Sequence, residues 1–143
     1  MTYAPALFMS AHGPVDRAER SARQALAVWD GLRRKSSPPE NDPAWPALKD
    51  RFLQAADDWG GLCRLAAARY AAGLEALEDA KHIPGGKDCG RDRILALDTV
   101  YTEIRTAWAE WRKAYILLGQ VIAAAPFALA AAGQVDAPPD CPP

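Results

Sequence analysis

The sequence has little of what usually builds a catalytic or metal centre. It contains two histidines and three cysteines in 143 residues, and no cysteine has a partner at the Cys-x-x-Cys spacing of a zinc or redox site. His12 and His82 stand near no recognisable nucleophile motif. His82 does follow acidic residues at helical spacing, but a di-iron bundle needs a second carboxylate–histidine pair on another helix. We therefore predict a protein that is not an enzyme, with no metal and no cofactor.

A strong net charge is missing as well. The formal net charge is −1, whereas a nucleic-acid-binding domain usually carries a clear basic excess. The charges are unevenly spread, with six basic and three acidic side chains in residues 1–37 and two basic and five acidic ones in residues 38–60. This favours a first helix that lies beside the start of the second, or that docks on an acidic partner.

The start of the chain lacks the basic residues and the long apolar run of a secretory signal. The cysteines are odd in number, and together these features favour the cytoplasm. Residues 114–133 carry no charge and have to be weighed as a membrane anchor. Gln120, Pro126 and many alanines bring the free energy of insertion close to zero, so a membrane location is unlikely on this pattern.

No stretch alternates apolar and polar residues with the period of two that a strand requires. Instead, apolar residues recur at alternating steps of three and four, which is typical of helices packed lengthwise as in a coiled coil. The longest such seam consists of Ile94, Leu97, Tyr101, Ile104, Trp108, Trp111, Tyr115, Leu118, Ile122, Ala125 and Leu129. We predict an all-α fold, an elongated antiparallel three-helix bundle with helices at about 14–35, 43–82 and 90–124 and a short fourth helix after Pro126.

Prolines and glycines set the expected boundaries. Pro14 suits a first helical position, and Asp42 before Pro43 suits the start of the second helix. Gly60-Gly61 should kink or break that helix, or else make room for a tryptophan from another helix. The expected organisation is an N-terminal strap at 1–13, one helical-bundle domain at 14–133, and a Pro-rich tail at 134–143 that is extended and outside the core.

The unequal helix lengths suggest a function. The first helix should reach only to about residue 65 of the second, so residues 66–105 form a two-helix arm with no third helix over its seam. An exposed apolar seam favours protein–protein interaction, either with a partner or in a homo-oligomer, within a larger assembly. The alternative is that residues 1–13 or 126–143 fold back and close the arm. The interface candidates are Tyr70, Leu74, Leu77, Ile94, Leu97 and Tyr101.

A second interpretation is contact with a nucleic-acid backbone. In length and helicity the chain resembles the small helical subunits of multi-subunit CRISPR effector complexes, which implies a place in a ribonucleoprotein. Basic clusters can bind phosphates without reading sequence, although acidic residues are interleaved with them here. A small helical inhibitor or immunity protein fits the sequence equally well. The nucleic-acid-contact candidates are Lys81, Lys87, Arg91, Arg93, Arg105, Arg112 and Lys113.

Overall fold

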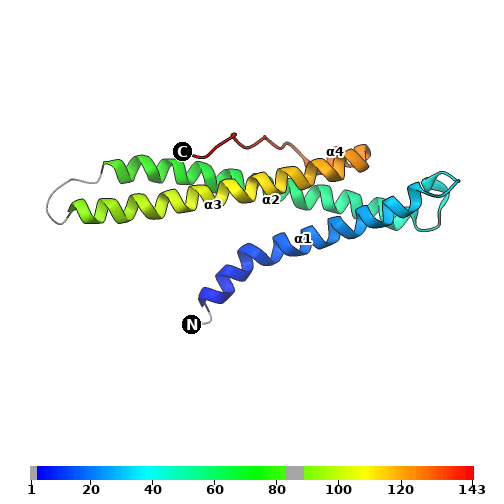
Figure 1. The fold of residues 1–143 in the computed structure, drawn as a ribbon, viewed down its shortest axis with the longest axis horizontal. Helices are drawn as coiled ribbons and strands as arrows, with labels where there is room; N and C mark the ends of the chain where they lie inside the picture. Colours follow the sequence, from blue (N-terminus) through cyan, green and yellow to red (C-terminus); the bar gives the residue numbers. More distant parts are fainter. Residues whose placement is uncertain (1–2, 83–88) are drawn as a thin grey trace. The chain divides into compact units, whose positions relative to one another are not determined.

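The structure, a computed structural model, describes residues 3–82 and 89–143, and these residues contain helices and no strand (Figure 1). This confirms the all-α prediction, including the short helix after Pro126. The elements are α1 (Tyr3–Arg33), the 3-10 turn η1 (Pro39–Asn41), α2 (Trp45–Lys81), α3 (Cys89–Ala124), the 3-10 turn η2 (Pro126–Ala128) and α4 (Leu129–Ala132).

The chain forms two compact units, and α2 and α3 each contribute to both. The first unit comprises residues 1–62 and 116–135. The second unit comprises residues 63–115 together with the C-terminal segment 136–143. The predicted single domain over residues 14–133 stays a prediction, and each unit is described below by itself.

Two helix starts differ from the predicted ones. α1 begins at Tyr3 and not at Pro14, so most of the predicted strap is helical. Pro5 lies in the first turn, where its missing N–H has no helical partner, and the alanine-, leucine- and methionine-containing stretch after it has high helix propensity. α2 begins at Trp45 because Asp42 first closes a turn. Its side chain accepts a hydrogen bond from the Ala44 N–H at 2.9 Å, and its carbonyl accepts one from Trp45 at 3.0 Å.

The expected break at Gly60-Gly61 is wrong, because α2 runs without interruption from Trp45 to Lys81. Within the first unit, Gly60 makes room for the backbone at the end of α4. A Cβ built on Gly60 would lie 2.9 Å from the Ala132 carbonyl carbon and closer still to its oxygen. The same construction on Gly61 meets nothing within 4 Å. The space is therefore used by a main-chain segment and not by a tryptophan.

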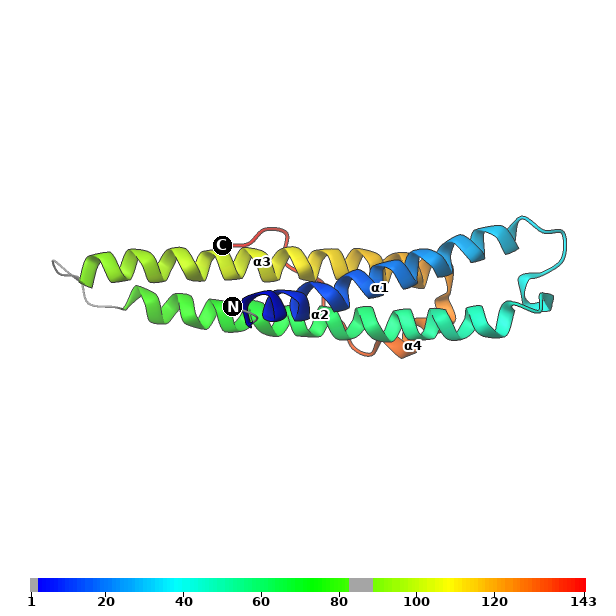
Figure 2. The same ribbon diagram turned by 90° about the horizontal axis from the view of Figure 1, so that it is seen from below.

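Aromatic rings join the parts of the first unit. Trp29 of α1 lies 5.8 Å from the Trp45 ring and 6.0 Å from the Phe52 ring of α2. Phe127 of η2 completes the cluster, at 5.8 Å from Trp45 and 6.4 Å from Phe52. Figure 2 shows the end of α1 and the start of α2 joined by the segment between them. Deeper in the unit, Trp59 is fully buried, and its indole N–H has no acceptor among the residues that the structure describes.

The buried face of α3 is rotated from the predicted seam. Ile104, Trp111, Leu118 and Ala125 are buried as predicted. Between them, however, the buried positions include Ala107, Ala114 and Val121, each one residue before the expected Trp108, Tyr115 and Ile122. Small side chains allow closer packing of the helix, and the larger residues lie at the edge of the buried face. Tyr115 is accordingly 39 % exposed.

Candidate interaction surface

The second unit is built on an antiparallel pair, residues 63–81 of α2 beside residues 89–115 of α3 (Figures 1 and 2). Close packing occurs at Gly73, where an added Cβ would lie 2.7 Å from Cγ1 of the fully buried Ile104. The Tyr70 and Trp111 rings pack with their centroids 5.7 Å apart. These contacts fix residues 69–73 of α2 opposite residues 104–111 of α3.

An ion pair marks one edge of this helix pair. Arg69 Nη1 lies 2.9 Å from Glu110 Oε2, and both side chains keep solvent contact. On the α2 helical wheel, Arg69 and Leu74 flank the buried positions on opposite sides. On the α3 wheel, Glu110 and Tyr101 do the same. Because Arg69 and Glu110 meet on one edge, Leu74 and Tyr101 share the other edge.

The predicted interface residues lie partly in the core and partly on that second edge. Leu77 is only 6 % exposed and belongs to the core. Ile94 is 68 % exposed and Leu74 is 37 % exposed. Ile94 and Tyr101 are seven residues apart and therefore project from one side of α3. We define the apolar strip as the five predicted residues that keep exposed surface, namely Tyr70, Leu74, Ile94, Leu97 and Tyr101.

Two of the predicted basic residues lie beside the apolar strip. The Arg105 guanidinium stands 6.0 Å from the Tyr101 ring centroid, and the Arg112 guanidinium stands 5.4 Å from that of Trp108. The two arginines are seven residues apart, so they share one side of α3 and each covers an aromatic face. Among the remaining basic candidates, Lys113 directly follows Arg112 on α3. Lys81 Nζ lies 4.0 Å from Glu78 Oε1 at the end of α2. The exposed basic residues of α3 also include Arg91, Arg93 and Lys113, and Lys87 lies outside the described residues.

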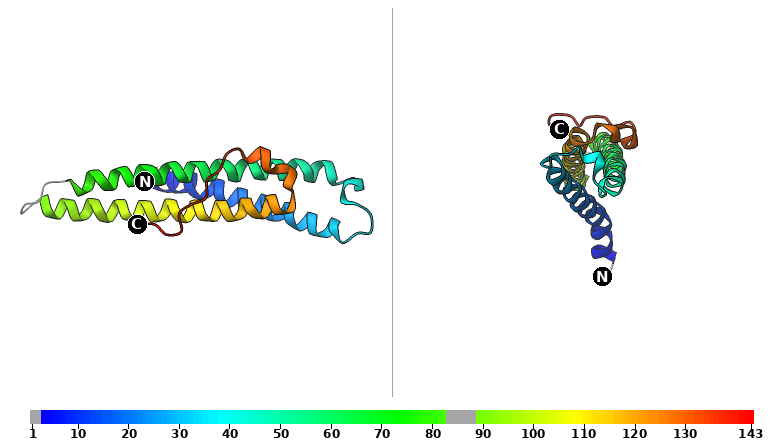
Figure 3. Two further views of the ribbon diagram at one scale, coloured as in Figure 1. Left: turned by 90° about the horizontal axis from the view of Figure 1, so that it is seen from above. Right: turned by 90° about the vertical axis from the view of Figure 1, so that its right-hand side faces the viewer.

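The C-terminal tail is bound to α3 at Trp108 and Trp111, a fold-back of the kind that the alternative interpretation allowed for residues 126–143, although these contacts lie beyond the predicted arm at residues 66–105. The Trp108 indole N–H donates to the Pro139 carbonyl at 2.6 Å. The Trp111 indole N–H donates to the Asp136 carbonyl at 3.0 Å. Figure 3 shows this red segment running along α3. The tail was expected to be extended and outside the core; its chain bends at Asp140 and Cys141, and the two indole hydrogen bonds attach it to α3. A pair of tryptophans three residues apart was the available signal, because buried indole N–H groups require acceptors.

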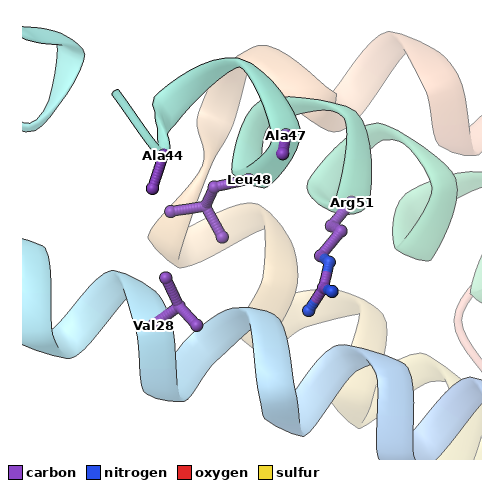
Figure 4. Close-up of a pocket in the computed structure, with 5 residues that line it drawn as sticks. All are labelled: Val28, Ala44, Ala47, Leu48 and Arg51. Carbon is purple, nitrogen blue, oxygen red and sulfur yellow. The ribbon is translucent and has the colours of Figure 1, made fainter. Parts of the chain in front are cut away.

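The first unit holds a shallow apolar pocket of its own. It measures about 200 Å³ and is open to solvent. Figure 4 shows Val28 of α1 facing Leu48 of α2, with the aliphatic stem of Arg51 at one side. The lining offers a single ionisable group and no acid, base or nucleophile to set beside it, so the pocket suggests no chemistry. Its lining residues are Val28, Ala44, Ala47, Leu48 and Arg51.

The titratable residues show no reactive constellation in the part of the chain that the structure describes. Burial raises the pKa of the Cys63 thiol to about 11, because the thiolate would lose its hydration. No three His, Cys, Asp or Glu side chains gather there as metal ligands would. His82 Nε2 lies 3.9 Å from Glu78 Oε2, and both residues are exposed. None of the helices, over the same residues, has the length and apolarity needed to cross a bilayer.

Comparison with known proteins adds no family: no protein-family model, curated protein or solved structure matches the chain.

Proposed function

We propose that the protein is a non-catalytic subunit of a larger cytoplasmic assembly, which docks on a protein partner or on a second copy through the apolar strip. The observation that carries the proposal is the exposure of Ile94, at 68 %, on the same side of α3 as Leu97 and Tyr101. Leu74 extends this surface onto α2 with 37 % of its area exposed. Contiguous apolar surface shared by two helices is typical of an interface, whereas single exposed leucines are not.

The residue types also suit an interface. Fully burying an exposed isoleucine or leucine side chain is worth about 1.5–3 kcal/mol, so Ile94 offers the largest gain on docking. Tyr101 supplies an aromatic ring that the Arg105 guanidinium already covers on one face. Tyrosine and arginine are among the residues that dominate binding energy at interfaces. The strip thus combines an aliphatic centre with an aromatic and cationic border.

Paired substitutions at neighbouring positions test the proposal. Ile94→Asp places a charge in the centre of the strip, and we expect it to abolish association. Leu95→Asp is the matched control, because Leu95 is 58 % exposed but lies about 100° further round α3. Association is measured by light scattering of the pure chain and by affinity capture from the native host, with circular dichroism to confirm equal folding. Equal association of both variants and the wild type would refute docking through the strip.

A specific observation favours nucleic-acid backbone contact as a second candidate function. Arg105 and Arg112 repeat an arginine-over-aromatic pair at a spacing of seven residues on one exposed side of α3. Arginines on aromatic faces bind phosphates and stack on bases in single-stranded nucleic acid. If this function is right, binding to single-stranded RNA falls steeply with salt, and Arg105→Glu with Arg112→Glu abolishes it. Salt-insensitive or absent binding would leave the protein-docking proposal alone.

A further inference from the structure

The tail has the composition of an extended proline-rich ligand. Prolines fix four of the eight φ angles in residues 136–143 near −65°. These prolines are Pro138, Pro139, Pro142 and Pro143. Each residue before a proline is also restricted to extended conformations. Over residues 136–139 the tail therefore favours a polyproline II helix, which has three residues per turn and leaves its carbonyl groups open to outside donors, and the chain bends after it at Asp140 and Cys141.

The two hydrogen bonds join carbonyl groups and indoles that have the same three-residue spacing in the sequence. The accepting carbonyls belong to Asp136 and Pro139, which are three residues apart and so lie on one side of a polyproline II helix. The donors, Trp108 and Trp111, are three residues apart and neighbours on one surface of α3. The pairs run in opposite directions, so the tail lies antiparallel to α3. Arg112 covers the Trp108 ring with its guanidinium 5.4 Å away and supports it.

We propose that Trp108 and Trp111 form a binding site for proline-rich extended segments of a partner protein, which the chain's own tail occupies in cis. Both contacts are made to main-chain carbonyls, so the site selects an extended backbone and not particular side chains. Asp136, Ala137, Pro139, Asp140 and Cys141 remain exposed, and the two indole hydrogen bonds hold the main chain of the tail on α3. The site adjoins the apolar strip, because the Tyr70 ring of the strip packs on Trp111, but its test is separate because it follows the two tryptophans themselves.

Competition with the tail provides the test. A covalently attached segment acts at an effective concentration on the order of millimolar, so it masks the site in the wild type. Replacing Pro138, Pro139, Pro142 and Pro143 with glycine in the full-length chain should release the tail. The probe is a synthetic peptide of residues 136–143 with serine in place of Cys141, and the control peptide has alanine at all four proline positions. Binding is followed through the indole ¹H–¹⁵N resonances in two-dimensional NMR.

We expect the proline peptide to shift the Trp108 and Trp111 resonances and to leave Trp29, Trp45 and Trp59 unmoved. It should bind the released-tail variant at least tenfold more tightly than the wild type. The alanine peptide should bind at least tenfold more weakly. Trp108→Phe in the released-tail chain keeps an aromatic ring but lacks the donor, and it should lose most of the affinity while circular dichroism stays unchanged.

Several results would overturn the proposal. Absence of binding to the released-tail variant would mean that the surface holds only its own tail. Equal affinity of the two peptides would remove the role of the extended backbone. Equal affinity of the wild type and the released-tail variant would place the peptide elsewhere. A concentration-dependent wild-type dimer that disappears on tail release would assign the site to tail exchange between two copies and not to a partner.

Discussion

The two units of the chain bury their apolar residues by different means. In the first unit, rings from α1, α2 and η2 meet in one cluster, with Phe52 fully buried against Trp29 and Phe127. In the second unit, two helices and the C-terminal tail bury the apolar residues, and Ile94 and Leu95 remain more than half exposed, as Leu129 does in the first unit. Three or more apolar surfaces close a core, whereas two helices leave an edge. The exposed edge, and not the closed core, is where an interaction site is expected.

The tryptophans make the same contrast. Trp59 of the first unit is fully buried, and its N–H has no acceptor among the described residues. Trp108 and Trp111 of the second unit both donate to the tail. A packed core tolerates an unpaired indole when the ring gains enough apolar contact, at a cost of about 1–3 kcal/mol. In the second unit, by contrast, both indole donors find their acceptors in the main chain of the tail.

The largest expected difference between the units is in stability. Phe52→Ala should lower the free energy of unfolding by about 3–5 kcal/mol, because it empties a fully buried position. Ile94→Ala should change it by no more than about 0.5 kcal/mol, since that side chain is 68 % exposed. Urea denaturation followed by circular dichroism measures both values. Similar losses for the two variants would show that Ile94 is packed in solution and that the comparison between the units is wrong.

A smaller effect is expected at the two glycines in the first unit. Gly60→Ala should cost about 1–3 kcal/mol, because the new methyl group meets the Ala132 main chain, which cannot rotate away. Gly61→Ala should instead gain about 0.5–1 kcal/mol, since its methyl group meets nothing within 4 Å and alanine favours the helix. Thermal unfolding of the two variants separates these signs. A neutral Gly60→Ala would mean that α4 does not pack on α2.

Cys63 and Cys141 should differ in the rate at which a thiol reagent labels them. Cys63 is 1 % exposed and its pKa is raised to about 11, so it is both inaccessible and protonated at pH 8. Cys141 is exposed on the tail. In a Cys89→Ser variant, a thiol reagent at pH 8 should label Cys141 rapidly and Cys63 only after denaturant has unfolded the protein. Rapid labelling of both thiols in the native protein would show that α2 opens readily at Cys63.

The smallest effect is expected at the turn before α2. The Ala44 N–H, and after it the Lys35 ammonium, lower the pKa of Asp42 below 3.8. The stabilisation is therefore fully present above the unfolded-state pKa and is lost as the pH falls through the folded-state pKa. Asp42→Asn should lower the melting temperature slightly at pH 7, and the difference from the wild type should shrink as the pH falls through the folded-state pKa of Asp42. If the melting temperatures of the wild type and the variant still differ in acid, the effect comes from packing and not from the charge of Asp42.

Periodicity predicted the helices well, because buried positions on α2 such as Phe52, Trp59 and Cys63 follow a three-four spacing. It could not predict which of two adjacent residues is buried. On α3 the seam shifts from Trp108 to Ala107, since close packing favours the smaller side chain. Local rules also failed at Gly60, where the reason for glycine is a segment more than 70 residues further along the chain.

Sequence reasoning predicted that residues of the apolar strip are exposed, and it did not predict the hydrogen bonds between α3 and the tail. Helix lengths placed Ile94, Leu97 and Tyr101 on an uncovered surface, and Ile94 is the most exposed of them. Leu77 had the same spacing on α2 but lies in the core. A fold-back of residues 126–143 was left open as the alternative, but where the tail binds could not be predicted, because its two contacts use main-chain carbonyls, which leave no pattern of side chains to read.

Site-specific photocrosslinking in the native host tests docking through the strip most directly. A benzophenone amino acid replaces Ile94 in one chain and Leu129 in another, since Leu129 is 60 % exposed but belongs to the first unit. Docking through the strip predicts a discrete covalent adduct, to one protein or to a second copy, at position 94 and none at position 129. The same adducts from both positions, or none from position 94, would contradict it.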